Sequence, residues 1–259
     1  MSEIVIVDDG SNPAIDPADF PQCKVISSSE NCGTGHARNL GIQAARSEWI
    51  AFLDADDVLH PGILDDRLKQ AQATLESGVS SDDKTVFACG WEETDAEGNA
   101  KMQRTPRGTE TPADFASGCW WCPGSTLLAR KSVFLSDNRF FDTKLRRLED
   151  YDWGIRFALA GGKLVVHNDI GVTIAPSGRA TSETVNQAAG YLIEKFSSLK
   201  DTDPKIHSNI RAYLSLERAT YALRDRRPLE ALKSLASSYL AVPRLKRHFS
   251  PGWIVKPNN

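Results

Sequence analysis

The chain opens with short apolar runs that alternate with polar turn signals. Residues 4–7 form a continuous β-branched run, Ile-Val-Ile-Val, which is typical of a strand buried on both faces of a sheet. The run stops at a dense turn signal over residues 8–13. The same kind of pattern predicts strands over 24–27 and 49–53, with a helix over about 36–46 between them. Alternation of strand and helix at this spacing predicts a mostly parallel α/β sheet.

The middle of the chain is less regular. A helix is predicted after Pro61, because apolar residues follow it at helical spacing. Residues 94–113 are polar and rich in turn formers, so we expect a loop or a weak hairpin there. Further elements are predicted by apolar runs: strands over 85–89, 125–129 and 163–167, and a helix over 150–159 that stops at a Gly-Gly pair.

The pattern changes to helix alone from about residue 183. Three amphipathic stripes follow one another, over 185–199, 206–221 and 228–240. We therefore predict two parts, a sheet domain over residues 1–180 and a C-terminal helical extension over residues 181–259. A basic stretch lies near the end, at Arg244, Lys246, Arg247 and His248.

Composition and charge narrow the function classes. Lys and Arg number 31 against 34 Asp and Glu, a net charge of −3, so no nucleic-acid partner is expected. The longest apolar stretches are about five residues, far below the ~18 needed to span a bilayer. Five cysteines, with no secretory signal, predict reduced thiols in the cytoplasm. Cys119 and Cys122 have the C-x-x-C spacing of redox or zinc sites, but a zinc site would need a second such pair.

Carboxylates follow two of the predicted strands at the point where each strand ends. Asp8 and Asp9 close the first, and Asp54, Asp56 and Asp57 follow the strand at 49–53. In open α/β sheets, ligands bind beyond the carboxyl ends of the strands. Clustered carboxylates repel one another, by about 4 kcal/mol for a pair at 4 Å and an effective dielectric near 20. Hard oxygen ligands of this kind favour Mg²⁺ or Mn²⁺, especially beside a diphosphate, although each motif alone also fits a simple turn.

The ordered set of motifs around these carboxylates resembles the family-2 inverting glycosyltransferases. That family has the GT-A fold, a Rossmann-like α/β arrangement. The resemblance covers about residues 3–175. It rests on these strings: Glu3 to Ser11; Asn31, Gly35, Ala37-Arg38-Asn39 and Gly41-Ile42; Trp49 to Asp57 with Pro61; Phe140-Phe141-Asp142; and Leu148 to Trp153, with Arg156, Ala158 and Gly161-Gly162 behind.

The resemblance implies a role for each matching residue. Asp9 matches the residue that reads the nucleobase, usually uracil, and Arg38 matches one near the nucleotide. Asp54 matches the position nearer ribose and sugar, and Asp56 the position that faces a divalent cation, Mn²⁺ or Mg²⁺. Asp150 matches the catalytic base. The implied reaction is a single displacement that moves a sugar from a nucleotide-diphosphate donor, typically a UDP-sugar, to a hydroxyl of a glycan or lipid-linked acceptor.

Other candidate residues have two interpretations each. Glu149 and Asp150 also fit an acidic pair at a helix N-terminus, where the macrodipole favours them. Asp152 is a second candidate base, and with Glu149 a weak candidate for acceptor or sugar binding. Trp120 and Trp121 fit either a stacking platform for a sugar or core aromatics at the base of a loop.

The resemblance also implies a missing segment. Family members begin with one more strand and helix before the strand at 4–7. This chain is therefore expected to lack roughly 30 residues, which is about the length of a βαβ unit without its last strand. In the family the absent strand lies between those at 4–7 and 49–53. We expect these two strands either to keep unpaired edges or to pair directly, and the affinity for a sugar-nucleotide to be reduced.

Two alternatives come from other functional classes. A receiver-type signalling domain also has paired aspartates after one strand and a further aspartate after a later one, here Asp54. A catalytically impaired paralogue would keep the fold and act as a binding protein through its helical tail. Alternatively, the helical tail is an amphipathic cap over the sheet, or it tethers the protein at the inner face of a membrane through its basic C-terminal stretch.

Overall fold

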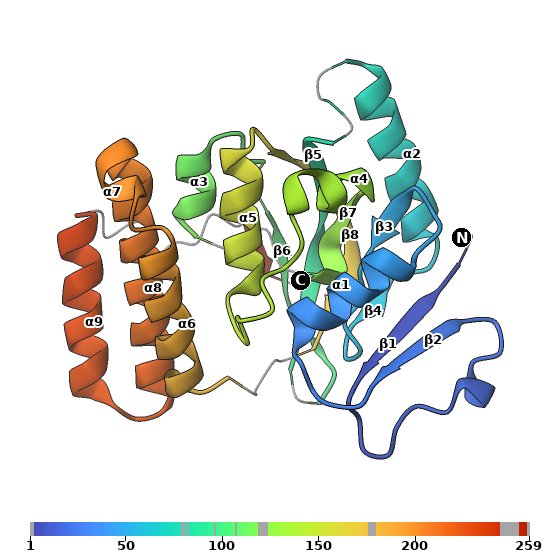
Figure 1. The fold of residues 1–259 in the computed structure, drawn as a ribbon, viewed down its shortest axis with the longest axis horizontal. Helices are drawn as coiled ribbons and strands as arrows, with labels where there is room; N and C mark the ends of the chain where they lie inside the picture. The colour runs from blue at the N-terminus through green and yellow to red at the C-terminus, as the bar shows by residue number, and fades with distance from the viewer. Residues whose placement is uncertain are drawn as a thin grey trace.

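The computed structural model describes most of the chain (Figure 1). The described residues are 3–78, 81, 83–95, 97–106, 108–118, 124–175, 180–243 and 254–257, of which 100–101, 138 and 254–257 are described by backbone alone.

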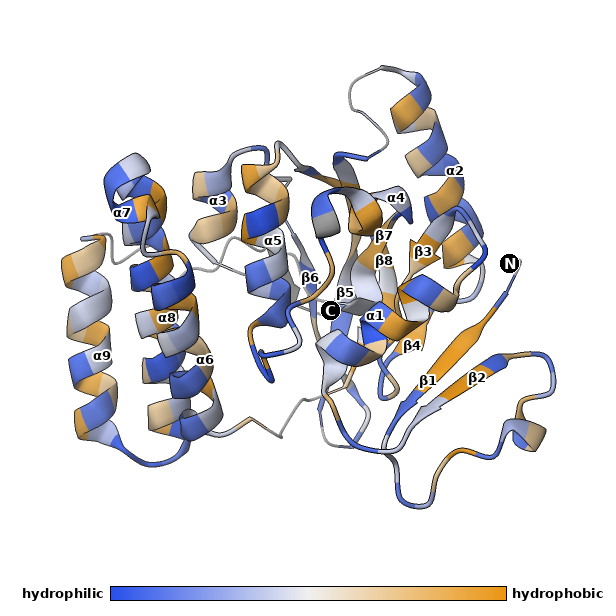
Figure 2. Ribbon diagram, viewed as in Figure 1, coloured by the Kyte–Doolittle hydropathy of each residue, from blue (hydrophilic) through white to orange (hydrophobic). Residues whose placement is uncertain are grey.

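A small two-stranded sheet holds the N-terminal part. β1 (Val5–Asp9) and β2 (Lys24–Ser28) pair in parallel, from Val5 opposite Lys24 to Asp9 opposite Ser28. Both strands are rich in apolar residues (Figure 2), as β-branched runs predict. The loop between them contains one 3₁₀ turn, η1 (Pro17–Asp19), so parallel pairing is reached by a long connection rather than a hairpin.

A larger sheet lies beside it, with β5 (Thr85–Thr94) at its centre. β8 (Lys163–Ile174) runs parallel to β5 on one side, and β7 (Leu127–Arg130) and β6 (Ala100–Thr105) pair with β5 in antiparallel fashion on the other. The sheet is completed in antiparallel fashion at its margins by β3 (Trp49–Ala51), β4 (Val58–Leu59) and β9 (Ile254–Pro257).

The α/β architecture is as expected, but this sheet is mixed rather than mostly parallel. β5 with β8 is its parallel pair among the strands described, and the other pairs are antiparallel. Within the described residues β1 pairs with β2 and β3 pairs with β7, so β1 and β3 do not pair directly. The direct pairing of these two strands is therefore not seen, and among the described residues neither strand has a second partner. The segment expected as a loop or weak hairpin does form a hairpin, because β6 turns back and pairs with β5, and the short helix α3 (Pro112–Ala116) begins at its end.

Helix α5 (Glu149–Leu159) joins two hydrophobic cores. One of its faces places Trp153, Phe157 and Ala158 in a core with the sheet, helix α1 (Thr34–Ala44) and the short helix α4 (Ser132–Leu135). The other face places Tyr151 and Ile155 in a second core with the C-terminal helices. Helix α2 (Ile63–Glu76) covers β5 and β7 through Ala71.

The C-terminal region is helical, as the amphipathic stripes predict (Figure 1). Its helices are α6 (Ser182–Lys195), α7 (Leu199–Thr202), α8 (Pro204–Arg224) and α9 (Pro228–Ala241). Prolines at the first positions of α8 and α9 match the preference for proline where a helix begins. Among the helices described, none is both long and apolar enough to cross a membrane. The basic stretch from Arg244 to His248 lies outside the described residues.

Candidate active site

The two aspartates that close β1 have different surroundings. Asp8 is buried and accepts hydrogen bonds from the amides of Ser11 and Ile15, at 2.9 Å each. These bonds, that from Ile15 foremost, lower the pKa of Asp8 and assign it to the turn after β1. Asp9, the next residue, points to the opposite face of the strand and accepts hydrogen bonds from the amides of Cys32 and Gly33, at 2.9 and 2.6 Å. Asp9 therefore lies against the N-terminal end of α1.

Arg38 brings two of the predicted site residues to one point. It lies in the first turns of α1, and its Nη1 donates to Asp150 Oδ1 at 2.7 Å. Its Nη2 donates to Asp54 Oδ1 at 3.0 Å. Asp150 comes from the first turn of α5 and Asp54 from the loop after β3, so one guanidinium joins three elements.

Arg38 and Asp150 are both buried, so the attraction between their charges is screened less than it would be in water. The Arg38 guanidinium also lies over the rings of Phe52 and Phe141, 5.7 and 5.5 Å from their centroids. Burial by itself lowers the pKa of Arg38, but the charges of Asp150 and Asp54 outweigh it and raise that pKa, so Arg38 stays a cation. Burial raises the pKa of Asp150 to about 7, against the opposing effect of Arg38. The pKa of Asp150 therefore lies well above the ordinary range of a carboxyl, even with Arg38 in contact.

The acidic loop after β3 is a turn closed by the Asp57 amide, which donates to the Asp54 carbonyl at 3.1 Å. Ser125, from the 3₁₀ turn η2 (Gly124–Thr126), holds both ends of this turn. Its Oγ accepts from the Asp54 amide at 2.9 Å and donates to Asp57 Oδ2 at 2.6 Å. Sequence reasoning missed Ser125, because a lone serine carries no signal until folding places it beside the turn.

The same turn has the donor chemistry for a divalent cation. Asp56 is exposed and makes no hydrogen bond or ion pair with the part of the chain that is described. Burial raises the pKa of Asp57, and the charges of Asp54 and Asp56 add to that rise. Negative charge is therefore concentrated here with one carboxylate open to solvent. Mg²⁺ is usually bound by one or two carboxylates of the protein, and substrate phosphates and water supply its other ligands. The acidic turn offers carboxylates of this kind for Mg²⁺ or Mn²⁺.

Gly124 allows Arg38 and Asp54 to approach each other. Its φ is +52°, and a Cβ at this position would lie 2.4 Å from Arg38 Nη2 and 3.1 Å from Asp54 Oδ1. No larger side chain fits without displacing the guanidinium. Sequence reasoning missed this glycine as well, since one glycine in a loop predicts only a turn.

Asn39 has a positioning role in the Ala-Arg-Asn string. Its side-chain amide donates to the Phe141 carbonyl and accepts from the Phe141 amide, both at 2.9 Å. The pair is buried and ties α1 to the segment before α5. This contact fixes the position of Arg38 relative to Asp150.

The weaker candidates are placed less favourably for substrate. Glu149 is buried beside Asp150, and its charge helps to raise the pKa of Asp150. Asp152 is fully buried, with Arg156 Nε at 2.8 Å and Lys195 Nζ at 2.6 Å. Its carboxylate is therefore engaged between α5 and α6 rather than directed at the acidic turn. Trp120 and Trp121, like Cys119 and Cys122, lie outside the described residues.

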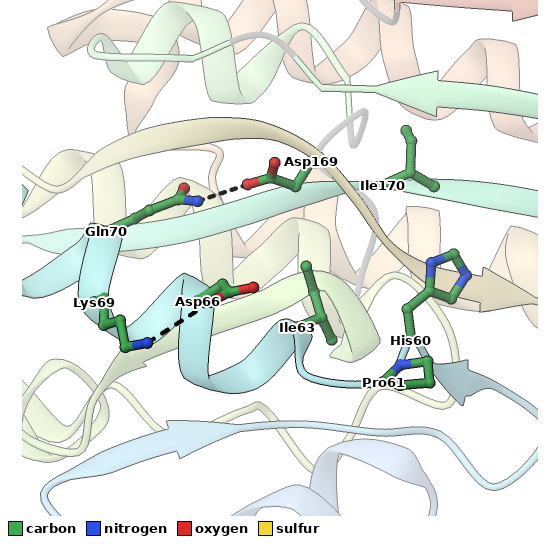
Figure 3. Close-up of a pocket in the computed structure, with 8 residues that line it drawn as sticks. All are labelled: His60, Pro61, Ile63, Asp66, Lys69, Gln70, Asp169 and Ile170. Carbon is green, nitrogen blue, oxygen red and sulfur yellow. Dashed lines mark hydrogen bonds and ion pairs between the residues drawn. The ribbon is translucent and has the colours of Figure 1, made fainter.

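A separate hollow of about 470 Å³ opens beside α2 (Figure 3). It is lined by His60, Asp66, Lys69, Gln70 and Asp169 with three apolar neighbours, and none of the predicted site residues is among them. Gln70 donates to Asp169 at 2.8 Å across one side. The candidate site is therefore the cluster around Arg38 rather than this hollow.

Comparison with known proteins gives a consistent set of matches. The family model described as Glycosyl transferase family 2 matches residues 2–132. The chain is 32% identical over 180 residues to the succinoglycan biosynthesis protein ExoO of Rhizobium meliloti (strain 1021), covering 65% of this chain and 51% of ExoO. It is 28% identical over 176 residues to the amylovoran biosynthesis glycosyltransferase AmsB of Erwinia amylovora, covering 63% of this chain and 56% of AmsB. It spans about half the length of these two relatives.

Solved structures show the same fold. S. aureus TarS superposes with a TM-score of 0.52 at 18% identity, covering 91% of this chain and 49% of TarS. A shorter form of TarS in complex with UDP-GlcNAc gives 0.52 at 17% identity, covering 99% of this chain and 88% of that form. The expected fold class is confirmed. The family match and this fold together overturn the receiver-domain alternative.

Proposed function

Because this chain belongs to glycosyl transferase family 2 and has the GT-A fold, we propose that it moves a sugar from a nucleotide-diphosphate donor to an acceptor hydroxyl with inversion. The observation that carries the proposal is the buried bridge in which Arg38 contacts both Asp150 and Asp54. The bridge supports the proposal because it brings Asp150, the proposed base, next to the acidic turn, and a single displacement needs both groups close together.

In the proposed reaction Asp150 is the general base. Its carboxylate takes the proton of the acceptor hydroxyl while that oxygen bonds to the anomeric carbon, and the bond from that carbon to the diphosphate oxygen breaks. A base is most effective when its pKa lies near the working pH, and Asp150 meets this condition at about 7. Arg38 orients the carboxylate of Asp150. Its positive charge also opposes the effect of burial and so limits the rise of the Asp150 pKa.

The donor would lie between Asp9 and the acidic turn. Asp9 is proposed to contact the nucleobase, and Asp54 the ribose or sugar. Asp56 would hold a divalent cation, Mn²⁺ or Mg²⁺, that stabilises the charge of the departing diphosphate when bound. TarS, a protein of similar fold, was solved with UDP-GlcNAc, so a UDP-sugar is the donor class to test first. ExoO and AmsB are named for polysaccharide biosynthesis, so we propose a glycan or lipid-linked acceptor.

The deciding experiment compares Asp150→Asn with the matched control Asp65→Asn, which changes an exposed aspartate on α2. Release of UDP from a panel of UDP-sugars is measured with Mn²⁺ present. We expect Asp150→Asn to lower turnover by about 10²- to 10⁴-fold, the usual contribution of a general base, and Asp65→Asn to change it little. Equal turnover in both variants would contradict the role of Asp150.

Calorimetric titration with UDP and Mn²⁺ tests the lowered donor affinity that we predict. Micromolar binding would contradict that lowered affinity. UDP binding without turnover in the unsubstituted chain would favour the non-catalytic paralogue. We also propose that the chain divides near residue 180 into a sheet part and a helical extension, and that it is cytoplasmic with peripheral contact at the inner face of a membrane.

A further inference from the structure

Three different side chains meet at the junction of β1 and α1. Asp9 closes β1, Cys32 lies in the loop before α1, and His36 lies in the first turn of α1. Within the described residues, a carboxylate oxygen, the thiol sulfur and an imidazole nitrogen of this trio all lie within 4.8 Å of one another. We call these three residues the Asp9–Cys32–His36 cluster.

Two features of the cluster point to a ligand. The Nδ1 atom of His36 is buried and has no hydrogen-bond partner in the described part of the chain. It lies 3.7 Å from Asp9 Oδ1, which is too far for a hydrogen bond. The Asp9 carboxylate is in turn held by the backbone amides of Cys32 and Gly33, at 2.9 and 2.6 Å. A pre-oriented carboxylate therefore lies within ion-pair distance of an imidazole nitrogen that makes no hydrogen bond in the described part of the chain.

The spacing suits a tetrahedral metal ion. Zinc binds oxygen, nitrogen and sulfur at about 2.0–2.3 Å, so neighbouring ligand atoms lie about 3.3–3.8 Å apart. The distance from Asp9 to His36 already falls in that range, and small side-chain rotations would bring in Cys32. Hydrogen bonds from backbone amides to Asp9 are the kind of support that orients a ligating carboxylate.

We propose that the Asp9–Cys32–His36 cluster binds Zn²⁺ or a similar borderline cation, with three protein ligands and one open position. The donor set separates this site from the acidic turn around Asp56. A thiolate and an imidazole favour zinc, whereas carboxylates alone favour Mg²⁺ or Mn²⁺. Because Asp9 is also the proposed nucleobase contact, a bound ion and a nucleotide would exclude each other. That consequence rests on the proposed function, whereas metal binding does not.

The test uses the full chain, reduced and freed of metal. Co²⁺ is added first, since cobalt bound to a thiolate gives a charge-transfer band in the near ultraviolet, and Zn²⁺ affinity is then measured by competition with a chromogenic chelator. The variants are Cys32→Ser and His36→Gln. The matched control is Cys23→Ser, which changes another free, half-buried cysteine outside the cluster. Circular dichroism spectra verify that each variant is folded.

We expect one Zn²⁺ per chain, a cobalt band that is absent in Cys32→Ser, and an affinity at least about tenfold weaker in both cluster variants. Cys23→Ser should bind like the unsubstituted chain, and excess Mg²⁺ should not displace Zn²⁺. The proposal is overturned if the unsubstituted chain shows no cobalt band. It is also overturned if Cys32→Ser and Cys23→Ser bind Zn²⁺ equally well.

Discussion

At the scale of the residue, the properties of Asp150 follow from two opposing influences. Burial disfavours its charged form and raises its pKa to about 7, while the Arg38 cation favours the charged form. A general base must be deprotonated, so activity should rise with pH through this value and fall away below it. Arg38 therefore adjusts the pH at which the proposed enzyme works.

Replacing Arg38 by Met should move the rising limb of kcat/KM to higher pH, because the charge that lowers the pKa of Asp150 is gone. Arg38→Lys keeps the charge and should give a limb closer to that of the unsubstituted chain, although a lysine cannot make both contacts. The measurement is the pH dependence of kcat/KM for the three proteins. If the rising limb of kcat/KM lies at the same pH in Arg38→Met as in the unsubstituted chain, Asp150 is not the base whose pKa Arg38 lowers.

Gly124 gives a second test at this scale. In Gly124→Ala the new Cβ would meet Arg38 Nη2 at 2.4 Å, so the guanidinium must move and activity should fall by about 10- to 100-fold. Gly78→Ala is the matched control, because Gly78 also has a positive φ but no atom within 4 Å of its Cβ position. Turnover is measured for both variants. An equal loss in both would attribute the effect to backbone strain alone.

At the scale of the element, α5 is held from the side by α6. Lys195 is the last residue of α6. Its Nζ lies 2.6 Å from Asp152 Oδ1 on α5 and 2.6 Å from Asp142 Oδ2, in the segment that precedes α5. Tyr191 also donates to Asp142, at 2.8 Å. Burial raises the pKa of Asp142, but the hydrogen bond that its carboxylate accepts from Lys195 outweighs burial and lowers that pKa. This network sets the position of the helix that carries Asp150.

Lys195→Met should therefore destabilise the fold, by about 1–3 kcal/mol, because it leaves the fully buried Asp152 with one cation fewer. The figure is below that for a fully buried pair, since Lys195 is 23% exposed. Chemical denaturation measures the change, with Lys233→Met on the exposed face of α9 as the control. An equal stability of the two variants would show that the network contributes little.

At the scale of the whole molecule, the C-terminal helices complete a core that α5 begins. Leu148, Tyr151 and Ile155 pack with Leu192 of α6 and Ile210 of α8 in one buried cluster. The proposed sheet domain therefore depends on the helical extension for part of its interior. A boundary drawn at residue 180 crosses this shared core.

A chain that ends at residue 180 should fold poorly. It would expose several large apolar side chains, each worth about 1.5–3 kcal/mol when buried. We expect no cooperative thermal transition and strong binding of a hydrophobic dye, in contrast to the full chain. A sharp transition in the shortened chain would show instead that residues 1–180 form an autonomous domain.

The local sequence pattern is enough to predict the helices and strands and the chemistry at their ends. Strands expected over 4–7 and 49–53 are β1 and β3, and the helix expected over 150–159 is α5 within a residue. The aspartates were found because they directly follow apolar runs, and the helical tail because its stripes repeat at helical spacing. These features depend on neighbours within a few residues, so the local pattern records them.

Which strands pair and which side chains meet depends on the packing of the whole chain. Periodicity shows which face of a strand is buried but not which strand lies beside it, so the mixed sheet was not predicted. Arg38 and Asp150 are 112 residues apart in the chain, and Ser125 and Gly124 acquire their roles only beside Asp54. The Asp9–Cys32–His36 cluster likewise arises because β1 ends against α1. Contacts between distant residues depend on how the whole chain packs, and the local pattern does not record them.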